Sequence, residues 1–336
     1  MSDAITKARR TLGFLTKPNL CKPRGARLVV TANCNLRCQM CTFWGKHHPD
    51  PSLETVKYWI KEMAEFGIKE IEIGGGEVSL RDDLEDMIKE IHSYGMSAGI
   101  TTNGWLIGGG QVPFPSVDFL EVSIDGAKPE THDKIRGLKG SWERAVKTVK
   151  MAKERNCPIH LNITLQKDNY LELPEYCDFV KKLGVKASII PISLKLAAQP
   201  RIPTWLGDYN IPILKDHLDK AFKSGVILNN KAFFDTIFLK KLEKGAFKTN
   251  CLAPFRCILI FINGDVYPCG NLDVAVGNLM PGKKFKDIYR EYAEMRKEIS
   301  TGQRDFCNKC LYTDIMTKKI LLSSIGPYMK QKIWKK

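Results

Sequence analysis

The 336-residue sequence predicts an α/β fold in which a parallel sheet, curved or closed, carries its helices on the outside. The main observation is that about six short β-rich runs alternate with amphipathic helical patterns along most of the chain. The composition, 43% hydrophobic and 26% charged, is that of an ordinary globular protein. No eighteen apolar residues run together, which argues against a membrane-spanning helix. Reactive groups of a parallel barrel lie at the carboxyl ends of its strands, where the polar motifs of this sequence also fall.

The expected strands are the β-rich runs 27–32, 70–74, 96–102, 119–124, 159–165 and 185–192. The expected helices are 53–66, 82–94, 141–155, 173–183, 213–224, 231–244 and 285–299. Ser52 is expected to cap the first helix and Gly67 to end it. The stretch 194–207, which contains two prolines, predicts a loop over one mouth of the sheet. Asn263-Gly264-Asp265 predicts a hairpin at the start of a different unit.

Eleven cysteines are the most informative feature of the composition. The amino terminus has no apolar core of the signal-peptide type, so we expect a cytoplasmic protein that uses cysteines for metal or redox chemistry. Cys34, Cys38 and Cys41 follow the first strand, and three thiolates on so short a loop can converge on one metal centre. Structural zinc would need a fourth ligand, for which His47 and His48 are candidates. An iron–sulfur cube held by three cysteines would instead keep one iron open.

Cys34, Cys38 and Cys41 match the cluster motif of the radical S-adenosylmethionine (SAM) enzymes, and the chain resembles that family over residues 25–195. The resemblance implies a partial (β/α)6 TIM-like barrel and a [4Fe-4S] cluster whose open iron binds SAM. It also implies reductive cleavage of SAM to a 5′-deoxyadenosyl radical that removes a hydrogen atom from the substrate. An electron donor of the flavodoxin or ferredoxin type is the implied partner.

Several motifs at strand ends resemble the SAM-binding elements of the family. Gly74-Gly75-Gly76-Glu77 resembles the element that holds the SAM amino group, although Val78 stands where proline is usual. The SAM contacts that the resemblance implies are Met40, Gly75, Gly76, Glu77, Asn103, Ser123, Asp125, Arg136 and Asn162. A guanidinium suits the SAM carboxylate, which is the role implied for Arg136. The alternatives are a glycine turn with a solvated Glu77, a surface salt bridge for Arg136 and a packing role for Asn162.

Five further cysteines lie in the last quarter of the chain and resemble the SPASM or twitch extension of the family. The small number of cysteines favours the shorter twitch form with one auxiliary [4Fe-4S] cluster. The implied ligands are Cys251, Cys269, Cys307 and Cys310, while Cys257 either replaces one of them or is a buried thiol on the hairpin. A four-thiolate zinc ribbon is the alternative. The remaining cysteines are expected to be incidental thiols: Cys21, Cys157 and Cys177.

The net charge of +15 is concentrated at the two ends of the chain. We expect a basic segment over 1–24, a barrel over 25–245, a twitch-like unit over 246–312 and a basic amphipathic tail over 313–336. Basic amphipathic segments can lie on an anionic membrane, which predicts peripheral attachment at the inner face of the membrane and a lipid or lipid-linked substrate. Solvated ends that pack on the barrel are the alternative. Nucleic acid is disfavoured because no RNA-binding motif is present.

The sequence therefore predicts a radical SAM enzyme whose auxiliary cluster assists an oxidation or a rearrangement. Two other substrate classes stay open, namely a ribosomally made peptide, for which the protein would be a maturase, and a small polar metabolite, which it would dehydrogenate. The non-enzymatic alternative is a zinc- or cluster-bearing binding protein on a barrel scaffold. The sequence identifies neither a hydrogen-atom donor nor a catalytic base.

Overall fold

The computed structural model describes residues 21–41, 43, 48–192, 208–271, 274–311, 317 and 320. His47, the loop predicted over 194–207 and nearly all of the two basic ends lie outside these residues. Within the described part of the chain, no helix has the length and apolar character needed to cross a membrane.

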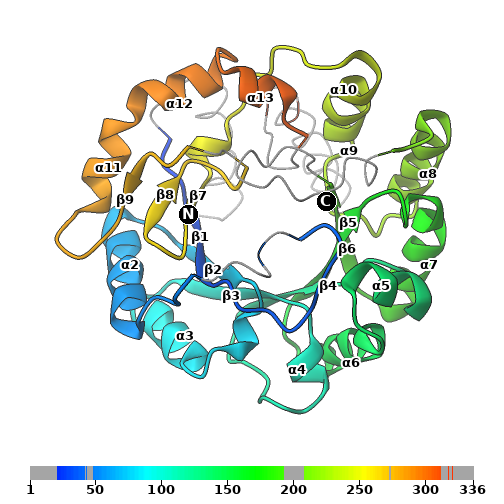
Figure 1. Cartoon of the computed structure of the whole chain (residues 1–336), viewed down its shortest axis with the longest axis horizontal. Helices are drawn as coiled ribbons and strands as arrows, with labels where there is room; N and C mark the ends of the chain where they lie inside the picture. The colour runs from blue at the N-terminus through cyan, green and yellow to red at the C-terminus, as the bar shows by residue number, and fades with distance from the viewer. Residues whose placement is uncertain are drawn as a thin grey trace, which may run out of the picture.

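One curved sheet organises the described residues, with strand order β6-β5-β4-β3-β2-β1-β7-β8-β9. Its first six strands are β1 Gly25–Thr31, β2 Glu70–Gly75, β3 Ser97–Thr102, β4 Phe119–Ser123, β5 Ile159–Leu165 and β6 Lys186–Pro191. Neighbours among these six are parallel, and Figure 1 shows them around a common centre with the helices outside. The predicted α/β class and the partial barrel are confirmed.

The helices around the barrel include two that the sequence did not predict. They are α2 Leu53–Phe66, α3 Leu84–Ser93, α4 Trp105–Gly108, α5 Pro129–Arg136, α6 Ser141–Glu154, α7 Leu173–Leu183 and α8 Ile211–Lys223. Ser52 caps α2 by accepting a hydrogen bond from Thr55 N at 3.2 Å, and Gly67 ends it at φ 102°, as predicted. The unpredicted helices are α4 and α5, both short.

Side chains on the barrel strands alternate between two environments, because successive residues of a strand point to opposite faces. Leu28 on β1 and Ile71 on β2 are fully buried in the main core, which also contains Trp59 of α2. Arg27 and Glu72, on the same strands, belong to the other face, which lines the inside of the curved sheet. The outer face is therefore apolar under the helices, whereas the inner face carries charged groups.

The C-terminal unit continues the barrel sheet. Its elements are α9 Lys231–Phe233, a π-helical segment Phe234–Phe238, α10 Leu239–Lys244, β7 Cys257–Ile260, β8 Asp265–Tyr267, β9 Gly277–Asn278, α11 Phe285–Glu291, α12 Ala293–Ser300 and α13 Asp305–Lys309. The predicted hairpin is confirmed as β7–β8, with Gly264 at φ 83° in its turn. Strand β7 lies parallel beside β1, with Cys257 opposite Gly25. The helix predicted over 285–299 is interrupted at Tyr292.

Three side chains of α2 also attach the C-terminal unit to the barrel. Trp59 Nε1 donates to Leu279 O at 2.7 Å, and Tyr58 Oη donates to Lys283 O at 2.6 Å. The Glu62 carboxylate, 2% exposed, accepts from Lys284 Nζ at 2.7 Å and from Phe285 N at 2.9 Å. Glu62 thereby satisfies a free amide at the amino end of α11, where a carboxylate is favoured.

We predict that Glu62→Gln lowers the free energy of unfolding by about 1–3 kcal/mol, because an amide has one acceptor oxygen for the two donors Lys284 Nζ and Phe285 N and turns an N–H towards the other. Glu65→Gln is the matched control, since Glu65 bonds the same Lys284 but is 48% exposed. Its effect should stay within about 0.5 kcal/mol. Urea denaturation followed by circular dichroism measures both. Equal effects of the two substitutions would contradict the role given to Glu62.

Candidate functional site

The first three predicted ligands lie on one loop at the carboxyl end of β1, called here the cysteine loop (residues 33–41). Cys38 is buried, whereas Cys34 and Cys41 are half-buried. Leu36 N donates to Cys34 Sγ and Phe43 N to Cys41 Sγ, each at 3.4 Å. Burial raises the pKa of the Cys34 thiol to about 12, and the neighbouring thiols add to the effect. The loop thus presents three thiols that must lose their protons when metal binds.

Helix α5 holds the cysteine loop from one side. Gln39 N donates to Ile135 O at 2.9 Å, and Arg37 N donates to Arg136 O at 3.3 Å. The loop amides thereby satisfy carbonyls at the end of α5 that the helix cannot satisfy itself. Gly137, at φ 73°, follows at once, and a Cβ there would lie 2.5 Å from Arg37 O. The close contact between α5 and the loop therefore requires glycine at this position.

The glycines after β2 hold the loop from the other side. Gly76 N donates to Thr31 O, and Glu77 N donates to Asn33 O, both at 2.8 Å. A Cβ on Gly75 would overlap Thr31 O, and one on Gly76 would lie 2.7 Å from Ala32 O and overlap Asn33 O. The close backbone approach that these two glycines allow is thus made to the protein's own chain. Their contact with SAM stays a prediction.

Glu77 is fully buried rather than solvated. Its Oε1 accepts from Ser79 N, Ser79 Oγ and Thr102 Oγ1 at 2.6–3.1 Å, and its Oε2 accepts from Asn103 N at 2.7 Å. The side chain of Asn103 in turn donates to Asn35 Oδ1 at 2.8 Å. Glu77 and Asn103 therefore tie the ends of β2 and β3 to the cysteine loop, in addition to any ligand they bind.

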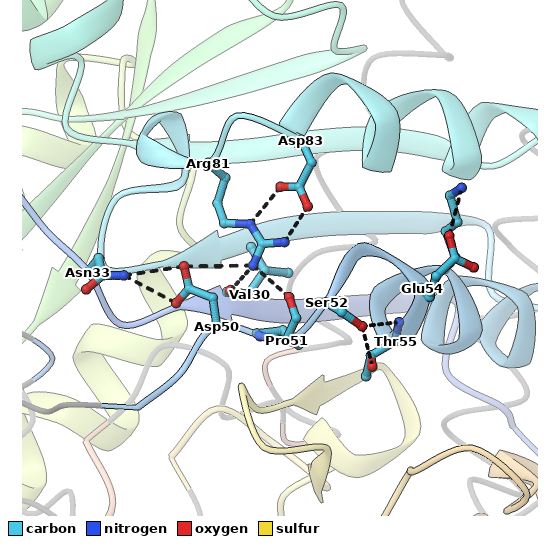
Figure 2. Close-up of polar contacts among 10 residues, drawn as sticks. Val30, Asn33, Asp50, Pro51, Ser52, Glu54, Thr55, Arg81 and Asp83 are labelled. Carbon is cyan, nitrogen blue, oxygen red and sulfur yellow. Dashed lines mark hydrogen bonds and ion pairs between the residues drawn. The ribbon is translucent and has the colours of Figure 1, made fainter.

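The Arg81 guanidinium holds the chain segments that precede and follow the cysteine loop (Figure 2). Arg81 donates to Asp83 at 2.6 and 2.7 Å, to Val30 O at 3.1 Å and to Pro51 O at 2.9 Å. Asp50 lies 3.8 Å from the same guanidinium and accepts from Asn33 Nδ2. The end of β1 and the approach to α2 are therefore connected through one buried cation.

Arg136 and Asp125 form a buried ion pair beside Cys38. Arg136 Nε lies 2.6 Å from Asp125 Oδ2, while Asp125 Oδ1 accepts from Thr164 N at 2.7 Å. Burial acts against the charge of Arg136, but Asp125 and Cys38 raise its pKa, so the guanidinium stays charged. Arg136 Nη1 lies 3.9 Å from Cys38 Sγ. The alternative of a surface salt bridge is wrong, since both partners are buried.

The remaining predicted contacts lie around the barrel mouth. Ser123, at the end of β4, stands in register with Asn162 of β5, and Met40 is half-buried in the cysteine loop. Asn162 Nδ2 donates to Glu121 Oε2 at 2.6 Å, so its amide belongs to a wider hydrogen-bond network. We call that network the inner polar layer, and its members are Arg27, Glu72, Thr101, Glu121, His160 and Asn162.

The inner polar layer connects five adjacent strands by charged contacts. Arg27 Nη2 lies 2.6 Å from Glu72 Oε1, and His160 Nε2 lies 3.1 Å from Glu121 Oε1. Thr101 Oγ1 donates to Glu72 and lies 3.2 Å from Glu121 Oε2. Burial raises the pKa of Glu72. Burial also acts to raise the pKa of Glu121, but His160 and Arg27 lower this pKa to about 2. This layer was not predicted from the sequence, where its signal was polar residues inside β-rich runs.

The second thiol set consists of four cysteines from three segments of the C-terminal unit: Cys251, Cys269, Cys307 and Cys310. Burial raises the pKa of Cys307 to about 12, and the nearby Cys251 and Cys310 add to the increase. Burial also raises the pKa of Cys269, and the same neighbouring cysteines add to that increase. No three His, Cys, Asp or Glu side chains of the described residues converge closely enough for a single metal ion. Cys257 lies on β7, opposite Gly25 of β1.

Three amide side chains near the site have buried polar atoms that lack hydrogen-bond partners. They are Asn35 Nδ2 and Gln39 Oε1 in the cysteine loop, and both side-chain atoms of Gln166, which directly follows β5 and is 0% exposed. An unpaired buried polar group costs about 1–3 kcal/mol, so such atoms suit a bound ligand. Sequence reasoning missed them, because an amide residue carries no motif of its own.

The chemistry of both thiol sets fits iron–sulfur clusters. Each is built from soft sulfur donors, with three in the cysteine loop and four in the C-terminal unit. A three-cysteine loop at the carboxyl edge of a parallel barrel, with unpaired polar atoms beside it, is the arrangement expected of an iron–sulfur enzyme.

Comparison with protein families identifies the enzyme class. The model of the radical SAM superfamily matches residues 28–180, and the SPASM model, an iron-sulfur cluster-binding domain, matches residues 251–311. Together the matches span more than half of the chain. The chain belongs to the radical SAM superfamily and carries a SPASM-type extension, as the cysteine motifs predicted. Its cofactors are [4Fe-4S] clusters and SAM, in place of the zinc alternatives, and it is an enzyme.

Curated relatives extend over nearly the whole chain. An AdoMet-dependent heme synthase of Methanosarcina barkeri is 27% identical over 92% of this chain and 95% of its own length. A probable GTP 3',8-cyclase of Methanococcus maripaludis is 26% identical over 83% of this chain and 97% of its own. Among solved structures, Streptococcus suis SuiB bound to its precursor peptide SuiA aligns with a TM-score of 0.62 and 18% identity, over 92% of this chain and 75% of that one. The structural likeness concerns the fold.

We predict that Gly76→Ala prevents assembly of the cluster on the cysteine loop, because a Cβ would push against Ala32 and Asn33. Gly74→Ala is the control, since a Cβ there would meet only Arg27 Cδ at 3.9 Å. Iron and sulfide per chain after anaerobic reconstitution measure the effect. About half of the iron should be lost in Gly76→Ala and none in Gly74→Ala. Full iron in Gly76→Ala would contradict the prediction.

Proposed function

We propose that this protein is a radical SAM oxidoreductase in which the second thiol set binds an auxiliary cluster that takes part in oxidation of the substrate. The observation that carries the proposal is the pairing of β7 with β1. Strand β1 leads into the cysteine loop, and β7 belongs to the unit that holds the four further cysteines. When bound, the cluster of the cysteine loop and SAM supply a 5′-deoxyadenosyl radical for hydrogen-atom abstraction.

We assign separate tasks to the residues around this chemistry. Cys34, Cys38 and Cys41 bind the first cluster, and Cys251, Cys269, Cys307 and Cys310 bind the auxiliary cluster. The proposed SAM contacts are Met40, Gly75, Gly76, Glu77, Asn103, Ser123, Asp125, Arg136 and Asn162. Asn35, Gln39 and Gln166 join them, because their unpaired buried amides can hydrogen-bond a ligand. A flavodoxin or ferredoxin is the proposed reductant.

The proposed division of the chain keeps the predicted bounds. The barrel occupies residues 25–245 and the auxiliary unit residues 246–312, while 1–24 and 313–336 form the basic ends. Peripheral contact of these ends with an anionic membrane stays a proposal that concerns residues almost entirely outside the structure.

The inner polar layer bears on the class of substrate. Its charged groups are half-buried and pair with one another, so they give the inside of the barrel a polar rather than an apolar lining. We therefore propose that the part of the substrate that reacts is polar. This holds whether that part is attached to a lipid, belongs to a peptide or is the whole of a small molecule. Arg27 and Glu121 are the charged groups that such a substrate would meet.

A second candidate is oxidation of an iron tetrapyrrole. The similarity to a heme synthase over 95% of that protein's length favours it, as does the 31% identity over 159 residues with an Fe-coproporphyrin III synthase. Anaerobic incubation with Fe-coproporphyrin III, SAM and dithionite tests this candidate. Conversion to heme would support it, and unchanged porphyrin together with continued 5′-deoxyadenosine release would exclude it.

We predict that the reconstituted protein binds about eight irons and releases 5′-deoxyadenosine when SAM and dithionite are added. The triple variant Cys34/Cys38/Cys41→Ala should retain about four irons and release no 5′-deoxyadenosine. Conversely, Cys307/Cys310→Ala should keep SAM cleavage, since its cysteine loop is intact. Iron analysis and liquid chromatography measure these outcomes. About four irons in the unmodified protein, unchanged in Cys307/Cys310→Ala, would contradict the auxiliary cluster.

A further inference from the structure

A buried lysine lies beside the second thiol set. Lys241 of α10 is 6% exposed, and its Nζ donates to Cys310 O at 2.8 Å and to Cys307 O at 3.2 Å. The ammonium group also lies 5.3 Å from the centroid of the Phe247 ring. Among the described residues, no carboxylate forms a salt bridge with Lys241. The cation therefore lies against the backbone carbonyls of two cysteines of the second thiol set.

A π-helical segment precedes Lys241, whose side chain lies on the buried face of α10. Residues Phe234–Phe238 form a π-helical segment immediately before α10. A π turn inserts an extra residue and changes which side chains face the core, and such turns are frequent at functional sites. The neighbouring Lys240 and Lys244 are exposed, whereas Lys241 is buried. The chain therefore buries one particular cation of a lysine-rich segment.

Hydrogen bonds connect Lys241 and Asn271 with two of the four predicted ligands. The ammonium group of Lys241 donates to the carbonyls of Cys307 and Cys310. Thiolates that hold a cluster would attract a fixed cation at this place. Asn271 adds a second donor, because its Nδ2 lies 3.0 Å from Cys310 Sγ.

We propose that Lys241 and Asn271 raise the reduction potential of the auxiliary cluster. The inference rests on the proposed function, in which the four cysteines bind that cluster. A reduced cluster carries one more negative charge than an oxidised one, so a fixed cation or an N–H donor stabilises the reduced form. Lys241 acts through its charge and through its hydrogen bonds to the backbone carbonyls of Cys307 and Cys310. It acts on the cluster through these two residues and is therefore a positioning residue. It makes the auxiliary cluster a better electron acceptor.

The test uses the full-length Cys34/Cys38/Cys41→Ala variant, so that only the auxiliary cluster is present. In this background we compare Lys241→Met, Lys241→Gln and Lys241→Arg by redox titration monitored by electron paramagnetic resonance. The Met and Gln variants should titrate at a lower potential, and the Arg variant close to the parent. Lys240→Gln is the matched control, since it removes an exposed charge from the same helix and should leave the potential unchanged.

Asn271→Leu provides a measurement independent of the lysine and should also lower the potential. Equal midpoints in the parent and in the Met and Gln variants, each with about four irons, would overturn the inference. So would a decrease in Lys241→Arg as large as that in Lys241→Gln, because charge would then not be the cause. Absence of iron from the parent itself would instead overturn the auxiliary cluster, which separates the two failures.

Discussion

The interaction on which the site depends is the backbone contact between the cysteine loop and its two neighbours. On one side the loop amides bond to the last carbonyls of α5, and on the other the amides after β2 bond to Thr31 and Asn33. Each contact is possible only because glycine removes a Cβ, at Gly137 and at Gly76. Cluster ligands on a loop need such support, because a mobile loop would not hold three thiols in one geometry.

Charge is distributed unevenly around the cysteine loop and the second thiol set, and the buried charges described at the two sets have different kinds of partner. Arg136 faces Asp125 beside Cys38, whereas Lys241 donates to two backbone carbonyls beside the second set and has no carboxylate partner among the described residues. The neutralised pair contributes little net field, and the unneutralised lysine contributes a positive one. The two cysteine sets therefore differ in electrostatics as well as in ligand number. This difference is what the proposed electron-accepting role of the C-terminal unit requires.

The sequence predicted α2 with its cap, strand β5 and the hairpin at Gly264, since local periodicity and turn chemistry specify them. It missed α5, because the segment Pro129–Arg136 is polar apart from Ile135 and shows no apolar stripe. It also missed the pairing of β7 with β1, since strands more than two hundred residues apart share no local signal. For the site, cysteine spacing predicted the superfamily and its SPASM-type extension, but burial and partners, as at Glu77 and Gln166, depend on tertiary contacts.

The position of β7 next to β1 has a consequence for the order of synthesis. Strand β1 is made first and β7 only after residue 256, so one edge of β1 has no strand to pair with during most of translation. The nascent barrel must therefore expose a sheet edge beside the cysteine loop until the last quarter of the chain emerges. Contacts of such large sequence separation form slowly. The sheet around the cysteine loop is complete only after the C-terminal unit has been made.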